Sequence, residues 1–263
     1  MRLIDSHSHL QADRFGDDVD AVIAAARDAG VERILVPGWN AWSSAAALEL
    51  VARVPWLDAA VGTHPHDSAK VTDEDWSDIV TAAADPRVVA IGETGLDYDR
   101  VFSPIPAQLA NLRRNLALAA ATAKPVVLHC RSRAGDRDAQ DALLRELRAH
   151  DGAIPGVVVH SFSGPLDYAE AMLELGAVIS ISGLAFRRGE EATADVVRIV
   201  PASRLLVETD APFLSPPGAP RGRNAPEWVG VTARWVAEVR GEEPDAFGDA
   251  LVSAYDARFA RRS

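Results

Sequence analysis

The strongest constraint on this chain is a repeated alternation of short apolar runs with longer segments of helical periodicity. Eight runs, rich in β-branched residues, have the length and composition of buried strands. They cover residues 3–7, 33–37, 57–63, 88–93, 126–130, 157–160, 177–182 and 204–210. Helices are predicted at 18–29, 43–53, 73–84, 106–123, 138–150, 166–175, 190–199 and 226–239.

Eight strand–helix units predict a parallel sheet that closes on itself. At 263 residues the chain has the usual length of one such barrel. We therefore expect a single (β/α)8 TIM barrel domain over residues 1–263, with the Pro/Gly/Arg-rich stretch 215–224 as a loop after the eighth strand. An open, doubly wound sheet is the competing architecture, and the positions of the polar residues favour the barrel.

Six of the seven histidines fall at or just after predicted strand ends. In a parallel barrel the functional groups come from the carboxyl ends of the strands, which meet at one mouth. The strand-end motifs are His7-Ser8-His9, Thr63-His64-Pro65-His66, Glu93-Thr94-Gly95, His129-Cys130-Arg131, His160-Ser161-Phe162 and Glu208-Thr209-Asp210. We expect these side chains to converge.

The converging set has the composition of a metal centre. His7 and His9 are two residues apart, so strand alternation directs both to the same face. Taken singly, each strand-end residue is also compatible with a hydrogen bond inside the barrel or with a helix cap. Together, four imidazoles and two carboxylates suit zinc, manganese, magnesium or a similar divalent ion, and six ligands suffice for two ions. The six are His7, His9, Glu93, His129, His160 and Asp210.

A binuclear centre of this kind indicates hydrolysis by a metal-activated water. The chain has no Gly-rich dinucleotide fingerprint, no phosphate loop and no G-x-S-x-G elbow, which argues against the corresponding enzyme classes. Its only lysines, Lys70 and Lys124, do not end the fourth strand, so a modified lysine is not available as a bridge. Glu93 is therefore expected to bridge the ions. Asp5 and Glu208, one layer deeper, are candidates to orient the imidazoles. Asp97, four residues past Glu93, is expected to cap or orient the following loop and not to bind metal.

The composition narrows the cellular location and the kinds of binding partner that we expect. A formal net charge of −11 argues against an extended basic surface for sequence-independent DNA binding. The first residues lead directly into a polar stretch, and no run reaches about 18 apolar residues, so a cytoplasmic protein without membrane association is expected. The single Cys130 indicates a buried thiol, and nothing in the sequence indicates an obligate protein partner.

Six motifs, in this order, resemble those of TatD-type metal-dependent deoxyribonucleases. They are Asp5-Ser6-His7-Ser8-His9-Leu10, Gly62-Thr63-His64-Pro65-His66, Ile91-Gly92-Glu93-Thr94-Gly95-Leu96-Asp97, Leu128-His129-Cys130-Arg131, His160-Ser161-Phe162-Ser163-Gly164 and Glu208-Thr209-Asp210-Ala211-Pro212-Phe213-Leu214. The resemblance extends from residue 5 to about 226 and is looser around 108–116 and 186–188. It implies one ion at His7, His9, Glu93 and Asp210 and a second at Glu93, His129 and His160.

The same resemblance implies a phosphodiesterase that acts on DNA, with single-stranded or frayed ends as substrate and possible cleavage from the 3′ end. We expect Asp210 to orient or deprotonate the attacking water and Glu93 to act with it. His64 is a candidate for binding a substrate phosphate, with a supporting role behind the ligands as the alternative. Three arginines beyond strands five and eight are further phosphate-binding candidates. They are Arg131, Arg221 and Arg223.

Two other functions remain open at this stage. The same centre serves hydrolysis of small esters or amides, including removal of a D-amino acid from tRNA. A non-catalytic protein with structural metal is disfavoured because structural zinc sites are typically closed and rich in cysteine. Trp39, Trp42 and Trp228 fall in or near strand-end loops, where either packing or stacking on unpaired bases is compatible with their positions.

Overall fold

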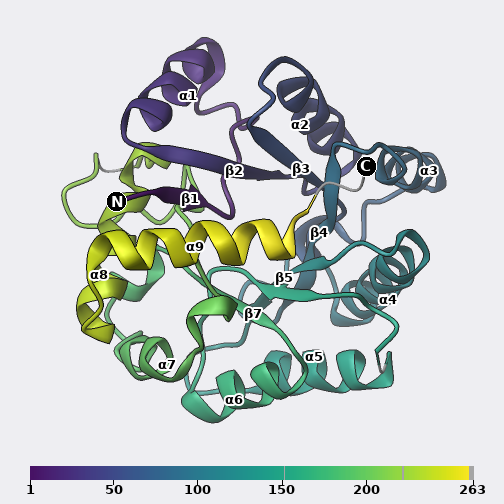
Figure 1. The fold of residues 1–263 in the computed structure, drawn as a ribbon. Coiled ribbons are helices and arrows are strands. Elements are labelled where there is room, and N and C mark those ends of the chain that lie inside the picture. The colour runs from purple at the N-terminus through teal and green to yellow at the C-terminus, as the bar shows by residue number, and fades with distance from the viewer. Residues whose placement is uncertain (151, 221, 261–263) are drawn as a thin grey trace.

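The computed structural model describes residues 1–150, 152–220 and 222–260 and contains eight parallel strands. Their order in the sheet equals their order in the sequence, as the barrel prediction requires (Figure 1). The strands are β1 (Leu3–Asp5), β2 (Val31–Pro37), β3 (Leu57–Val61), β4 (Val88–Asp97), β5 (Val126–Arg131), β6 (Val157–Val159), β7 (Val178–Ile181) and β8 (Leu205–Val207). The predicted (β/α)8 fold is confirmed.

Helices surround the strands on the outside of the barrel (Figure 1). They are α1 (Val19–Asp28), α2 (Ala41–Arg53), α3 (Asp73–Ala83), α4 (Ile105–Thr122), α5 (Asp138–Ala149), α6 (Leu166–Glu174), α7 (Thr193–Ile199), α8 (Val229–Arg240) and α9 (Pro244–Arg258). Two of these helices have a capping box at the N-terminus, formed by Asn40 and Ser43 at α2 and by Thr72 and Asp75 at α3.

The first and last strands are joined by backbone hydrogen bonds, which exclude an open sheet. The N–H of Ser6 donates to the carbonyl of Val207 at 3.0 Å. Beyond the strands proper, Asp210 N–H donates to the carbonyl of His7 at 2.9 Å, and His9 N–H donates to that of Ala211 at 2.8 Å. We call this junction, in which residues 6–9 pair with residues 207–211, the closing seam. It contains three of the predicted metal ligands, His7, His9 and Asp210.

The end of β4 differs from the prediction. We expected the strand to end at Glu93, but it continues to Asp97 through a bulge between Ile91 and Thr94. The bulge depends on Gly92, which has a φ of +131°. A Cβ atom there would lie 2.4 Å from the carbonyl oxygen of Val127 on β5. A glycine is required because only it tolerates both this backbone conformation and this approach.

Helix α9, which the sequence pattern did not predict, crosses one end of the barrel (Figure 1). It packs so closely on the amino-terminal segment that a Cβ at Gly248 would lie 2.6 Å from the carbonyl oxygen of Arg2. The Tyr255 hydroxyl donates to Oδ2 of Asp58, a buried residue near the start of β3, at 3.0 Å. Helix α9 thus covers the end of the barrel opposite the strand-end histidines.

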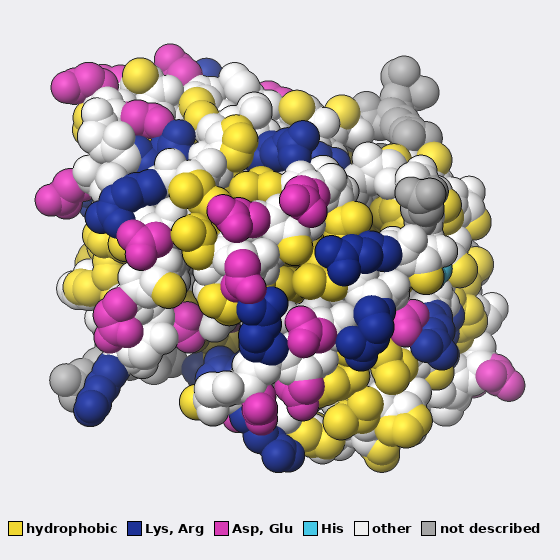
Figure 2. Space-filling model, turned by 90° about the horizontal axis from the view of Figure 1, so that it is seen from below, with side chains coloured by type: hydrophobic (Ala, Val, Ile, Leu, Met, Phe, Trp, Pro, Cys, Tyr) yellow, Lys and Arg dark blue, Asp and Glu magenta, His cyan; other side chains and the backbone are white. Residues whose placement is uncertain are grey.

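The surface on the side of α5 and α6 carries mixed charge. Figure 2 shows basic, acidic and apolar side chains interspersed there, without a continuous basic area. On this face the structure agrees with the inference drawn from the acidic net charge. Among the described residues, no helix is both long enough and apolar enough to cross a membrane.

Changing Tyr255 to Phe tests how strongly α9 secures the barrel. The substitution removes one hydrogen bond to a buried carboxylate and leaves the ring in place, so we expect the free energy of unfolding to fall by about 2 kcal/mol. Urea denaturation followed by circular dichroism measures this. Ser253→Ala, on the exposed side of the same helix, is the control and should change stability much less. Equal stability of the two variants would contradict the role assigned to Tyr255.

Candidate metal centre

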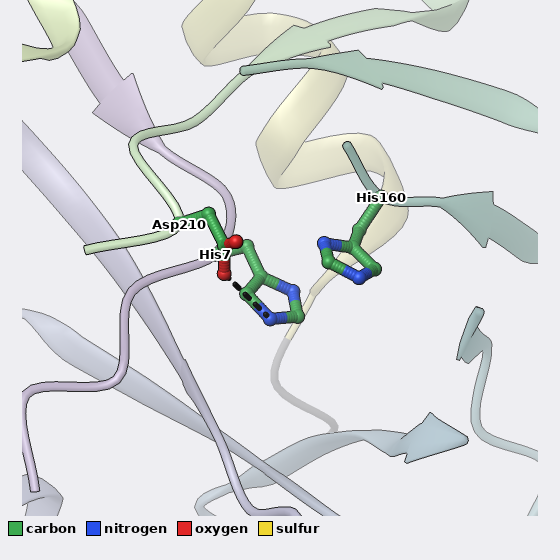
Figure 3. Close-up of side chains that lie close together, drawn as sticks. All are labelled: His7, His160 and Asp210. Carbon is green, nitrogen blue, oxygen red and sulfur yellow. Dashed lines mark ion pairs between the residues drawn. The ribbon is translucent and has the colours of Figure 1, made fainter. Parts of the chain in front are cut away.

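A cavity of about 470 Å³ opens at the carboxyl ends of the strands. His9, Glu93, His129, His160 and Asp210 line it, while His7 is fully buried beneath. Figure 3 shows His7, His160 and Asp210 approaching one another from separate segments of the barrel. The structure thus brings together all six residues expected to bind metal.

Glu93 lies at the centre of the group and is 3% exposed. Its two carboxylate oxygens face different partners. Oε2 lies 3.3 Å from Nε2 of His7 and 3.5 Å from Nε2 of His9. Oε1 lies 2.8 Å from Nε2 of His160 and 3.3 Å from Nδ1 of His129. The carboxylate therefore presents one oxygen to each of two imidazole pairs.

Asp210 adds a second carboxylate to the His7–His9 pair. Its Oδ1 lies 3.5 Å from Nε2 of His9 and 3.8 Å from Nε2 of His7, the pair joined by the dashed line in Figure 3. The residue has a φ of +52°, and its N–H is held by the carbonyl of His7. The closing seam therefore sets the direction of this side chain. Burial opposes its ionisation, but hydrogen bonding from His9 and nearby imidazoles lower the pKa of Asp210.

The outward nitrogens of three rings donate hydrogen bonds away from the centre. Nδ1 of His9 donates to the Pro37 carbonyl at 3.2 Å. Nδ1 of His160 donates to Oε1 of Glu208 at 3.1 Å, and Nε2 of His129 donates to Oδ2 of Asp97 at 3.2 Å. A neutral imidazole has one N–H, so each ring directs a lone pair inward. Nδ1 of His7 has no hydrogen-bond partner among the described residues.

This arrangement fits divalent metal ions. The inward nitrogens lie 2.8–3.5 Å from carboxylate oxygens, so either a second proton on the ring or a metal ion must lie between each such pair. Without metal, protons must supply the positive charge: burial lowers the pKa of His160, but Glu93 and Glu208 raise it well above its usual value. Groups such as His7, His9 and Glu93 place one donor atom each within 4.8 Å of the others. Imidazole and carboxylate donors together are typical of divalent-ion sites.

His64 faces the same carboxylate but differs from the ligand candidates. Its Nε2 lies 3.2 Å from Oε1 of Glu93. Its other nitrogen, Nδ1, accepts a hydrogen bond from the backbone N–H of His66 at 3.0 Å. The proton of a neutral His64 ring therefore lies on Nε2 and points into the centre. Burial lowers the pKa of His64 to about 4, so the ring is neutral near pH 7.

Two acidic residues behave differently from the sequence-based expectation. Asp97, expected only to cap or orient a loop, has an Oδ2 that accepts hydrogen bonds from His66 at 2.8 Å and from His129 at 3.2 Å. Asp5, expected to orient an imidazole, instead accepts from the backbone N–H and hydroxyl of Thr209 at 2.9 and 2.6 Å. Asp97 therefore supports a candidate ligand, while Asp5 secures the closing seam. Contacts between strands that are distant in sequence decide both roles.

The predicted phosphate-binding arginines are not gathered at one place. Arg131 lines the cavity, where its Nε donates to Oδ2 of Asp99 at 2.8 Å. Arg223 pairs with Asp18 at 2.8 Å and does not line the cavity. Arg221 lies outside the described residues. Arg14, which the sequence analysis did not single out, lines the cavity from the loop after β1. A single arginine in a loop gives no sequence signal of such a position.

Comparison with known proteins identifies the relatives of this chain. The family model of TatD-related DNases matches residues 4–260. A 3′-5′ ssDNA/RNA exonuclease TatD of Erwinia billingiae is 39% identical over 253 residues, which cover 94% of this chain and 94% of that protein. An uncharacterized metal-dependent hydrolase, YabD, of Bacillus subtilis is 33% identical over 238 residues, which cover 90% and 91% of the two chains.

Solved structures agree with these sequence matches. YJJV, a TatD homolog from Escherichia coli K12, superposes with a TM-score of 0.88 at 34% identity and covers 98% of each chain. A dihydroorotase from Campylobacter jejuni has a TM-score of 0.61 at 11% identity, covers 100% of this chain and 84% of its own, and shares the fold. The chain belongs to the TatD-related DNase family of metal-dependent hydrolases.

Proposed function

We propose that this protein hydrolyses phosphodiester bonds of single-stranded DNA, removing nucleotides from the 3′ end with the help of two divalent ions. The observation that carries the proposal is the division of the Glu93 carboxylate between two imidazole pairs. The name of the Erwinia relative, a 3′-5′ ssDNA/RNA exonuclease, supports the substrate class and the direction.

His7, His9, Glu93 and Asp210 would hold one ion, and Glu93, His129 and His160 would hold the other. When bound, such ions activate water and neutralise charge that develops on the phosphoryl oxygens. Glu208 and Asp97 hold His160 and His129 in the orientation that this binding requires. The imidazole and carboxylate donors suit zinc, manganese, magnesium or a similar divalent metal.

Asp210 is the proposed general base. Its pKa is lowered, so the carboxylate is ionised near neutral pH, and the residue lines the cavity where a substrate phosphate would lie. Oδ1 faces the imidazoles of His7 and His9, which leaves Oδ2 to accept the proton of the attacking water. The water oxygen forms a bond to phosphorus as the bond between phosphorus and the 3′ oxygen of the preceding nucleotide breaks. The leaving 3′ oxygen takes a proton from solvent, which releases a 5′-mononucleotide and leaves a 3′-hydroxyl on the shortened strand.

His64 is proposed as a neutral hydrogen-bond donor to a phosphoryl oxygen. Its Nε2–H points into the centre because the His66 backbone occupies Nδ1. A fixed donor of this kind stabilises charge in the transition state without needing to reorganise. Arg131 lines the cavity and donates a hydrogen bond to Asp99. It is the candidate for a second phosphate contact, in which the substrate phosphate replaces Asp99 as the partner of the guanidinium.

Metal analysis combined with digestion of end-labelled DNA tests the proposal directly. We expect two equivalents of metal per chain and progressive shortening of a 5′-labelled single-stranded oligonucleotide from its 3′ end. Chelation should stop the reaction and lower the melting temperature, because ions bound to the folded state stabilise it. Tightly bound metal without phosphodiesterase activity, or hydrolysis of a D-aminoacyl ester instead, would overturn the proposal.

Changing Asp210 to Asn tests the general base. The amide is nearly the same size but does not accept the proton, so kcat should fall by about 100- to 10,000-fold while the fold is retained. Steady-state digestion kinetics, thermal melting and metal content should be measured on the same preparation. Near-normal turnover in this variant would remove Asp210 from the role of base.

A pair of alanine variants separates His64 from the metal ligands. His64→Ala should keep both equivalents of metal but lower kcat by about 100-fold, the typical cost of losing one such donor. His129→Ala should lose metal. His64→Gln retains a side-chain N–H and should recover part of the rate. Loss of one metal equivalent in His64→Ala, measured by elemental analysis, would instead make His64 a ligand.

A further inference from the structure

The mouth of the barrel carries exposed aromatic side chains. Among the described residues, Trp42, Phe102 and Phe213 are the aromatic side chains with high exposure, at 58%, 64% and 46%. Trp42 lies in the first turn of α2, Phe102 in the connection between β4 and α4, and Phe213 in the loop after β8. All three segments leave the carboxyl ends of strands, so the three rings belong to the end of the barrel that holds the centre.

Each exposed ring is in contact with a ring of the cavity. Phe213 lines the cavity, with its ring centroid 6.1 Å from that of His9 at an interplanar angle of 73°. Phe102 lies 4.7 Å from His66 at 71°. Trp42 lies 6.0 Å from Trp39, which itself packs 5.1 Å from His9. We call Trp42, Phe102 and Phe213 the aromatic rim.

We propose that the aromatic rim binds unpaired bases of a single-stranded nucleic acid by stacking, an inference that rests on the proposed function. Burying an aromatic side chain is favourable by about 1.5–3 kcal/mol, so three rings left largely in water on separate loops of one mouth indicate a ligand that covers them. Every base offers a flat face for stacking, and only unpaired bases leave that face free.

The charge of the protein supports stacking as a source of affinity. A chain with a net charge of −11 repels a polyanion at long range. Local positive charge is present at the rim: the guanidinium of Arg14 lies 5.1 Å from the centre of the Phe213 ring and also lines the cavity. Stacking supplies binding energy that does not depend on phosphate contacts, so the affinity should respond less to salt than that of a basic DNA-binding protein.

An exposed apolar side chain at the other end of the barrel, Ile199, offers a comparison with the rim. Ile199 ends α7 and immediately precedes the turn into β8, so it lies at the opposite end of the barrel. It is 40% exposed and aliphatic, which makes it a suitable control. Neither Ile199 nor the three rim residues are among the six candidate metal ligands, so metal content should be unchanged in all of these variants.

Binding of nuclease-resistant oligonucleotides to the metal-loaded enzyme tests the inference. The probe is fluorescein-labelled oligothymidylate with phosphorothioate linkages, compared by fluorescence anisotropy with an abasic strand of equal length and with a duplex. We expect Trp42→Ala, Phe102→Ala and Phe213→Ala each to weaken binding of the thymidylate strand by about 5- to 100-fold. Phe102→Tyr and Phe213→Tyr should bind like the unmodified protein, as should Ile199→Ala.

Two comparisons make the outcome decisive. The abasic strand should bind weakly to the unmodified protein and be little affected by the alanine changes, and in digestion assays these changes should raise KM more than they lower kcat. Equal affinity for abasic and thymidylate strands, or unchanged binding in all three alanine variants, would overturn the role of the rim. If the unmodified enzyme cleaves single strands while the rim variants keep its KM, only this inference fails. If it cleaves no nucleic acid, the proposed function fails.

Discussion

The burial of the Glu93 carboxylate is the interaction on which the rest of the centre depends. Moving a carboxylate out of water costs several kcal/mol unless positive charge and hydrogen bonds replace the water. Burial opposes ionisation of Glu93, yet the imidazoles of His64, His160 and His7 lower its pKa well below its usual value. The bulge at Gly92 brings the carboxylate to this position. The outer hydrogen bonds of His129 and His160 then keep their inward nitrogens directed at it.

The chain segments that close the barrel also carry one half of the metal centre. The backbone bonds between the extensions of β1 and β8 include those of His7, His9 and Asp210, whose side chains form one half of the centre. Thr209, which precedes Asp210 in the chain, is held by Asp5 through both its N–H and its hydroxyl. Ions bound to this half would therefore also join the first strand to the last, which couples metal binding to the stability of the closed barrel.

The region around the centre combines two kinds of recognition. The cavity floor presents imidazoles, carboxylates and the Nε2–H of His64, which suit a phosphate group held by ions. The rim presents aromatic faces, which suit bases. With the proposed substrate, this division would reconcile an acidic protein with a polyanion, because attraction would be concentrated at the metal centre and the contacts at the rim would be apolar.

The residue pattern was enough to predict the barrel and the kinds of side chain at its mouth. Alternating buried strands and amphipathic helices predicted the eight units. Four of the strand-end histidines, together with Glu93 and Asp210, predicted a metal centre, because strand ends of a parallel barrel must meet. Sequence did not predict α9, whose contacts with Arg2 and Asp58 join distant parts of the chain. Nor did it reveal the hydrogen bond from His66 that makes His64 a donor, the support of His129 by Asp97, or the meeting of Trp42, Phe102 and Phe213 at one mouth. Periodicity indicates which face of a strand or helix a residue occupies. Its hydrogen-bond partners and its exposure depend on which loops meet in the folded barrel, and these contacts join residues that are far apart in the sequence.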